Sequence, residues 1–289
     1  MSAPPDPRPA PEASAFELSP EPWLEAFRRA VAAHRQIFAA NSGIAGRTEY
    51  EGIGEGGDRT LVIDRLCEDA VFAELERLRA GGLDFRAIAE ERGEVAFGSE
   101  ASPLRVVIDP IDGSLNARRT IPCHSLSIAV LDGDSMADAA IAFNHEFGAD
   151  EEFVAVRGEG ARLDGRPLEV IAGDGLEVVA MEATRPERML AALELLDGRA
   201  YRIRTTGSIA VSLCYVAAGR FDGMLSTRHC RSVDAAAGQL IVREAGGGVY
   251  FGGIELGATP LDLGSRYHVV AARTEADLEV LREAQRALP

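Results

Sequence analysis

Apolar residues recur along the first eighty residues at the spacing of amphipathic helices. We expect a first helix over residues 19–41, because a serine and a proline stand at its start and apolar side chains follow at helical intervals. Its apolar stripe consists of Trp23, Phe27, Val31 and Phe38. We expect a second helix from about residue 64 to the glycine pair at 81–82. Its inward face is predicted to hold Leu66, Ala70, Leu75 and Leu78.

The rest of the chain changes to short apolar or alternating runs, which are typical of strands. In the first half these runs predict a largely antiparallel layer, with strands at residues 85–89, 106–108, 125–131, 137–143 and 152–156. In the second half strands alternate with helices at residues 186–196, 209–218 and 235–245, and a capping box at Thr274 begins a closing helix. We therefore expect an N-terminal α+β region (19–172) and a C-terminal α/β region (173–289). The Pro- and Ala-rich residues 1–18 are predicted to be a disordered tail.

Composition narrows the range of partners. The chain has 289 residues, 46% of them hydrophobic, and a formal net charge of −16. Such an acidic surface argues against binding to nucleic acid or to an anionic membrane. A small anionic substrate would need a local positive centre. The chain shows neither an apolar run long enough to span a bilayer nor a signal-peptide pattern, so a cytoplasmic location is expected.

The most informative stretch is Asp109-Pro110-Ile111-Asp112-Gly113-Ser114, which follows an apolar run at 106–108. Pro110 is expected to end that strand, because proline lacks the N–H that a ladder needs. Asp109 and Asp112 would repel each other unless a hard cation lay between them. Gly113 allows backbone N–H groups to point outward as an anion site. The plain alternative is that Asp-Pro and Asp-Gly are ordinary turn dipeptides.

Other acids stand at the boundaries of predicted elements. Asp64 and Asp234 each lie near a helix start, where an acid complements the helix dipole or caps the helix without any further role. Glu90, with Glu91 beside it, follows a predicted strand, and such a pair is usually a solvated loop. With Asp109 and Asp112 these acids could converge on one pocket, although sequence alone does not show that they do.

Taken together, these residues resemble the signature of the inositol monophosphatase superfamily. The stretch at 109–116, the Gly-Asp-Arg-Thr run with Asp64, the Glu90-Glu91 pair and the Asp234 motif occur in that family's order and spacing. The resemblance covers nearly everything from residue 19 onward. Ser114 in place of a threonine and Arg228 before Asp234 look most like the archaeal-type branch, which acts as fructose-1,6-bisphosphatase and inositol-1-monophosphatase.

The resemblance implies a five-layered α/β/α/β/α sandwich and catalysis with up to three Mg²⁺ ions, for which Mn²⁺ could substitute. The metal ligands it implies are Glu90, Asp109, the carbonyl of Ile111, Asp112, Asp234 and Asp64. Ser114 would contact metal or the attacking water, polarised by Asp64 or Thr60, and Glu90 could accept a proton. The amides of Gly113 and Ser114 would hold the phosphate. Family members are commonly homodimers.

The substrate is predicted to be a small phosphorylated metabolite, with fructose 1,6-bisphosphate as first choice. Arg228 and Arg231 suggest a second anionic group, and Arg185 and Tyr201 are weaker candidates; ordinary surface charge is the alternative for each arginine. Inositol 1-phosphate is the close alternative substrate, and nucleotide phosphates are more distant ones. The alternative to an enzyme is a non-catalytic metal-binding protein that keeps the same fold.

Overall fold

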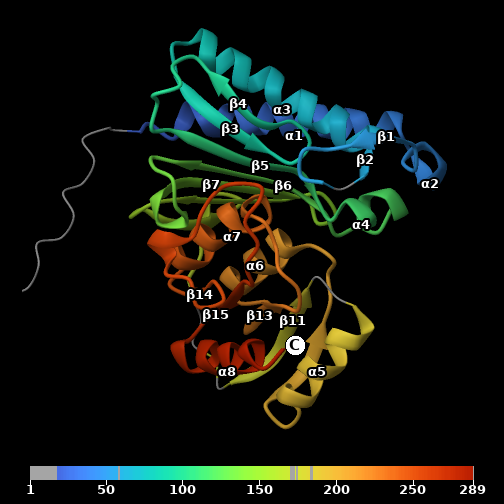
Figure 1. Ribbon diagram of the computed structural model, residues 1–289, viewed down its shortest axis with the longest axis vertical. Coiled ribbons are helices and arrows are strands. Elements are labelled where there is room, and N and C mark those ends of the chain that lie inside the picture. Colours follow the sequence, from blue (N-terminus) through green and yellow to red (C-terminus); the bar gives the residue numbers. More distant parts are fainter. Residues whose placement is uncertain (1–17, 58, 170–172, 174, 183–184, 289) are drawn as a thin grey trace, which may run out of the picture.

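The helices and sheets of the protein stack in five layers (Figure 1). The computed structural model describes residues 18–57, 59–169, 173, 175–182 and 185–288, so of the predicted tail only Leu18 is among the described residues. Helices α1 and α3 cover an eight-stranded sheet, α6 and α7 fill the space between this sheet and a five-stranded one, and α5 and α8 cover the far side. This α/β/α/β/α order confirms the predicted fold class.

The outer helices α1 (Glu21–Ala40) and α3 (Val62–Ala80) bury one face each. The predicted stripe of α1 is confirmed, since all four of its side chains are buried. The predicted stripe of α3 is wrong in its first half, because Leu66 and Ala70 are only half-buried. Its buried apolar face is made by Ile63, Cys67, Val71, Phe72, Leu75 and Leu78. The side of α3 that packs on the core carries Ile63, Cys67 and Val71, and Leu66 and Ala70 are partly exposed beside it.

The first sheet has the strand order β10-β9-β8-β7-β6-β5-β3-β4. Only the β3–β5 pair is parallel among the strands described, which agrees with the predicted antiparallel layer. The strands are β3 (Phe85–Ala89), β4 (Gly93–Phe97), β5 (Arg105–Asp112), β6 (Ser125–Leu131), β7 (Ala139–Glu146), β8 (Glu151–Val156), β9 (Gly160–Leu163) and β10 (Arg166–Pro167). A hairpin of β1 (Tyr50–Ile53) and β2 (Arg59–Leu61) and the short helices α2 (Gly43–Gly46) and α4 (Ser114–Arg119) lie at one end.

Strand β5 does not end at Pro110 as predicted but continues to Asp112. Its pairing with β6 slips by one residue, since Asp109 faces Ser127 and Asp112 faces Ser125. This bulge takes Pro110 out of the regular ladder, so its missing N–H is tolerated. The consequence is that both aspartates are held by a buried strand rather than by a loose turn.

The second sheet has the order β12-β11-β13-β15-β14. Strand β11 (Leu176–Glu182) pairs in parallel with β12 (Ala200–Arg204) and β13 (Gly223–Ser226), and the remaining pairs are antiparallel. The other elements of this half are α5 (Pro186–Leu196), α6 (Ile209–Ala217), α7 (Ser232–Glu244), β14 (Gly248–Tyr250), β15 (Val270–Ala272) and α8 (Glu275–Arg286). No helix in the described part of the chain is long and apolar enough to cross a bilayer.

Helix starts follow the sequence signals in part. The hydroxyl of Thr274 caps α8, as predicted, and the hydroxyl of Ser208 caps α6. The predicted cap of α1 is wrong, because the N-cap position is Pro20 and no side chain caps that end. Helix α7 begins at Ser232, which places Asp234 in its first turn rather than before it.

Candidate active site

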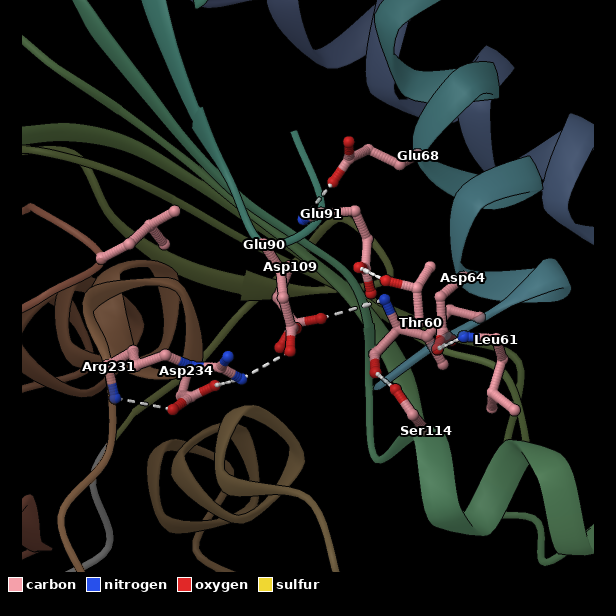
Figure 2. A network of polar contacts seen from close by, with 12 residues as sticks. Thr60, Leu61, Asp64, Glu68, Glu90, Glu91, Asp109, Ser114, Arg231 and Asp234 are labelled. Carbon is pink, nitrogen blue, oxygen red and sulfur yellow. Dashed lines mark hydrogen bonds and ion pairs between the residues drawn. The ribbon is translucent and has the colours of Figure 1, made fainter. Parts of the chain in front are cut away.

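A cavity of about 340 Å³ lies where the two halves of the fold meet. The carboxyl ends of the parallel strands β3 and β5 open into it, and the first turns of α3 and α7 face it from either side (Figure 2). Open α/β sheets bind their ligands at this end of their strands. The acids that line it are Asp64, Glu90, Glu91, Asp109, Asp112 and Asp234. All five acids proposed from sequence therefore converge on one pocket.

The centre of the cavity is a cluster of Asp109, Asp112 and Asp234. Each offers a carboxylate oxygen, and these oxygens all lie within 4.8 Å of one another. Asp109 and Asp112 are only 2% and 8% exposed, so water does little to screen their repulsion. Three carboxylates this close, with so little solvent, form a donor set that suits a hard divalent cation.

The Asp112 carboxylate also holds the start of α6. Its Oδ2 accepts a 2.5 Å hydrogen bond from the hydroxyl of Ser208 and another of 2.5 Å from the backbone N–H of Ala210. These donors belong to the N-cap and first turn of α6, where helical N–H groups lack partners within the helix. The contact fixes Asp112 and ties β5 of the first sheet to the helices between the sheets.

Asp64 and Asp234 occupy the same position in two different helices. Each is the third residue of its helix, and its carboxylate accepts a hydrogen bond from the N–H of the N-cap residue: 3.2 Å from Leu61 for Asp64 and 2.7 Å from Arg231 for Asp234. The plain interpretation of both as helix-start acids is therefore correct as far as it goes. The other oxygen of Asp64, Oδ1, is buried without a hydrogen-bond partner in the cavity wall.

Glu90 and Glu91 follow β3 and are fixed from several sides. The backbone carbonyl of Glu90 accepts a 2.9 Å hydrogen bond from Gly56, in the loop between β1 and β2. The N–H of Glu91 donates to the carboxylate of Glu68, and the Glu91 carboxylate accepts a hydrogen bond from Thr60. The pair is thus not a solvated loop, and both side chains line the cavity.

Arg231 reaches between two of the acids (Figure 2). Its Nη2 lies 2.6 Å from Oε1 of Glu90 and 3.6 Å from Oδ1 of Asp234. The guanidinium is largely buried and offsets part of the negative charge of the cluster. Its position here, beside the carboxylates, could not be read from the spacing of Arg228 and Arg231 in the sequence.

Burial raises the pKa values of several acids in the cavity. Together with the charges of Glu90 and Glu91, it raises the pKa of Asp64 to about 7, and with the charge of Asp234 it raises the pKa of Asp112 to about 7. Burial also raises the pKa of Glu90 to about 7, although Arg231 opposes the change, and raises the pKa of Asp109 well above its ordinary range. A bound cation would reverse these shifts, since it favours the charged carboxylates.

The segment after Asp112 borders the same cavity. Gly113 has a φ of +93°, a left-handed conformation that suits glycine, and the segment carries the N–H groups of Gly113 and Ser114. The hydroxyl of Ser114 donates a 2.9 Å hydrogen bond to the carbonyl of Ile111. Asn116 fixes the segment from behind through 2.7 Å hydrogen bonds to the carbonyls of Cys123 and Thr206.

Three residues proposed to contact substrate are not among those that line the cavity. Arg228 is exposed in the turn before α7, and Arg185 is exposed at the N-cap of α5. Tyr201 is 64% exposed on the edge strand β12 and lines a separate hollow with Gly175 and Gly198. The structure places Arg231 in the cavity and does not bring these three to it.

The site predicted from sequence lacks Tyr50, Glu68 and Arg118 and gives Glu91 no role. Tyr50 and Arg118 line the cavity, and Glu68 supports Glu91 from behind. Arg118 stands four residues after Ser114, so the helical spacing could have suggested that both lie on one face. Tyr50 and Glu68 reach the site only through tertiary contacts, for which the sequence offers no local indication.

Buried carboxylates that can share cations, next to a glycine-containing turn at the cavity wall, are typical of metal-dependent phosphoryl-transfer enzymes. Residues 20–288 match the model of the inositol monophosphatase family. The chain belongs to this family and is a metal-dependent phosphomonoesterase, and the cluster of Asp109, Asp112 and Asp234 is consistent with the family's metal binding. The family predicted from the motifs is confirmed.

Relatives of two kinds are similar to this chain. An inositol-1-monophosphatase of Mesorhizobium japonicum is 34% identical over 239 residues, covering 80% of this chain and 85% of that protein. A fructose-1,6-bisphosphatase/inositol-1-monophosphatase of Thermococcus kodakarensis is 33% identical over 242 residues, covering 83% and 88%. A crystal structure titled inositol monophosphatase-fructose 1,6 bisphosphatase superposes with a TM-score of 0.76 at 25% identity, covering 91% of this chain and 99% of that one.

Proposed function

We propose that the protein hydrolyses the phosphomonoester of a small sugar or polyol phosphate with Mg²⁺, and that fructose 1,6-bisphosphate is its first-choice substrate. The observation that supports the reaction is the carboxylate cluster within 4.8 Å, set beside the amides of Gly113 and Ser114. A cation there would neutralise the acids, and the amides would face the transferred phosphate.

The described residues fit divalent metal ions. The donors are hard carboxylate oxygens. Asp64 Oδ1 is buried without a hydrogen-bond partner, as expected of an oxygen that coordinates a cation. Asp109, Asp112, Glu90, Asp234, Asp64 and the Ile111 carbonyl would hold up to three Mg²⁺, or Mn²⁺ in its place. When bound, the metal would polarise the phosphate and lower the pKa of a bound water.

The chain's own groups would do the rest. The N–H groups of Gly113 and Ser114 stabilise charge on the phosphate oxygens in the transition state. Glu90, whose side chain lines the cavity, would accept the proton of the attacking water. The Ser114 hydroxyl, which donates a hydrogen bond to the Ile111 carbonyl, would accept one from the attacking water. Thr60 donates a hydrogen bond to the Glu91 carboxylate, so it would fix Glu91 rather than polarise Ser114.

The choice of a bisphosphate is supported by Arg118 and Arg231, which line the cavity, and by the name of an archaeal relative, a fructose-1,6-bisphosphatase/inositol-1-monophosphatase. Inositol 1-phosphate is the alternative substrate, supported by the similarly distant bacterial relative called an inositol-1-monophosphatase.

The test is phosphate release with Mg²⁺ from fructose 1,6-bisphosphate and inositol 1-phosphate. We expect Asp109→Asn to lower the rate on either substrate by at least about 100-fold, because it removes a buried member of the cluster. Asp197→Asn makes the same chemical change at an exposed position after α5 and should leave the rate unchanged. Equal rates for wild type and Asp109→Asn would contradict the assignment of the site.

A further inference from the structure

Two arginines are among the residues that line the active-site cavity, and they have different surroundings. Arg231 is paired with Glu90 and Asp234, so its charge is already balanced by the carboxylate cluster. Arg118 is half-buried, and in the described part of the chain no carboxylate lies within ion-pair distance of it. Arg118 is thus the cavity's available positive charge.

Arg118 is held in place by an aromatic neighbour. Its guanidinium donates a hydrogen bond to the hydroxyl of Tyr50 and lies 5.8 Å from the centre of that ring. Tyr50 belongs to strand β1, so the contact joins the β1–β2 hairpin to α4 across the mouth of the cavity. A guanidinium held by a neutral hydroxyl keeps its remaining donors for a ligand, because Arg carries five N–H groups in a fixed fork.

The position of Arg118 on α4 sets its distance from the phosphate amides. Ser114 and Arg118 are four residues apart in one helix, so they lie on the same face with about 6 Å of rise between them. A helical side chain also leans toward the helix start. The Arg118 side chain is therefore on the face of α4 that carries Ser114, and its Cα is about one helical turn from that residue.

We propose that Arg118, positioned by Tyr50, binds a second anionic group of the substrate, several bonds away from the phosphate that is cleaved. The inference rests on the proposed function, and it assigns the selectivity for a bisphosphate to Arg118. On a chain with a formal charge of −16, a cation without a carboxylate partner inside the cavity favours the doubly charged substrate. Tyr50 acts as a positioning residue in this scheme.

The experiment compares fructose 1,6-bisphosphate with fructose 1-phosphate, which lacks only the second phosphate. We expect Arg118→Gln to lower kcat/KM for the bisphosphate by about 10- to 100-fold, through KM, as for the loss of a hydrogen-bonded charged partner. The loss on fructose 1-phosphate should be less than about threefold, so the selectivity ratio falls. Tyr50→Phe should give a smaller loss in the same direction. Raising the salt concentration should weaken bisphosphate binding less in Arg118→Gln than in wild type.

Arg119→Gln is the matched control, because Arg119 is the next residue of α4 and is exposed. It should leave the selectivity ratio unchanged. A selectivity ratio that stays at the wild-type value in Arg118→Gln would overturn the inference, whether both activities fall together or neither falls. Wild type that cleaves inositol 1-phosphate but not the bisphosphate would also overturn it, while the phosphatase assignment stands. No phosphate release from any of these substrates would refute the proposed function, and the inference with it.

Discussion

Glu68 gives the sharpest test of the electrostatics around the site. Its side chain is fully buried one helical turn after Asp64, and its Oε2 accepts a 2.9 Å hydrogen bond from the N–H of Glu91. Its Oε1 is buried without a hydrogen-bond partner in the described structure, although Nε of Arg92 lies 3.4 Å away. Burial raises the pKa of Glu68 from 4.5 to about 7.

The sign of the effect follows from proton binding. Between pH 4.5 and 7 the folded chain holds a proton on Glu68 that the unfolded chain has released, so the free energy of unfolding falls as pH rises through this range. Above pH 7 the group is ionised in both states and the loss is complete. A pKa change from 4.5 to about 7 corresponds to about 3 kcal/mol.

We therefore expect Glu68→Gln to remove this dependence. The glutamine oxygen can still accept from Glu91, and the amide stays neutral at every pH. Relative to wild type, the variant should be of similar stability or slightly weaker at pH 5 and more stable by up to about 3 kcal/mol at pH 8. Urea unfolding in EDTA at both values measures the difference without a contribution from bound metal.

The matched control is Glu76→Gln, an exposed glutamate of the same helix, which should show the same small effect at both pH values. If Glu68→Gln changed the free energy of unfolding equally at pH 5 and pH 8, the raised pKa of Glu68 would be wrong, and with it the picture of a poorly solvated acidic site.

Three further predictions follow from the site. Gly56→Ala should lower phosphatase activity by about tenfold, because a Cβ there would lie 2.8 Å from Nη1 of Arg231 and 3.0 Å from the Glu90 carbonyl. The control is Gly52→Ala, whose added Cβ would meet no atom within 4 Å. Equal activity of the two variants would count against a close contact between the Gly56 loop and the site. Ser208→Ala should lower the free energy of unfolding in urea by about 1 kcal/mol, because α6 loses its cap. It should also weaken Mg²⁺ binding, because the Asp112 carboxylate loses a 2.5 Å hydrogen bond. An unchanged Mg²⁺ affinity in titration calorimetry would show that this hydrogen bond does not orient the carboxylate. Mg²⁺ should bind more weakly at pH 6 than at pH 8, because protons compete with it for Asp64, Glu90 and Asp112, each with a pKa of about 7 in the metal-free protein. Equal affinities at the two pH values in titration calorimetry would contradict these pKa values.

The parts of the site that could be predicted are those whose residues are close in sequence or stand at clear element boundaries. The run from Asp109 to Ser114 carries its chemistry within six residues, and Asp64, Glu90 and Asp234 each stand where an apolar pattern begins or ends. Their convergence was inferred through the family resemblance, because no local rule states which strand ends meet.

What the sequence could not supply depends on tertiary packing. The pairing of Arg231 with Glu90 joins residues 141 apart, and nothing near Arg231 distinguishes it from the exposed Arg228. The buried side of α3 is the side that packs against α1 and β5, and the residue pattern of the helix does not identify these partners. Strand β5 continues past Pro110 because a bulge absorbs the proline, and a bulge depends on the partner strand.

The shared position of Asp64 and Asp234 has a consequence for how this family changes over evolutionary time. Each acid accepts a hydrogen bond from an N–H at the start of its own helix, so an acid at either position makes a structural contact as well as being a proposed metal ligand. The presence of an acid at either position in a relative is therefore not by itself evidence of catalysis. Glu90 lies outside any helix, but its carboxylate pairs with the largely buried Arg231, so its presence too would have a structural reason.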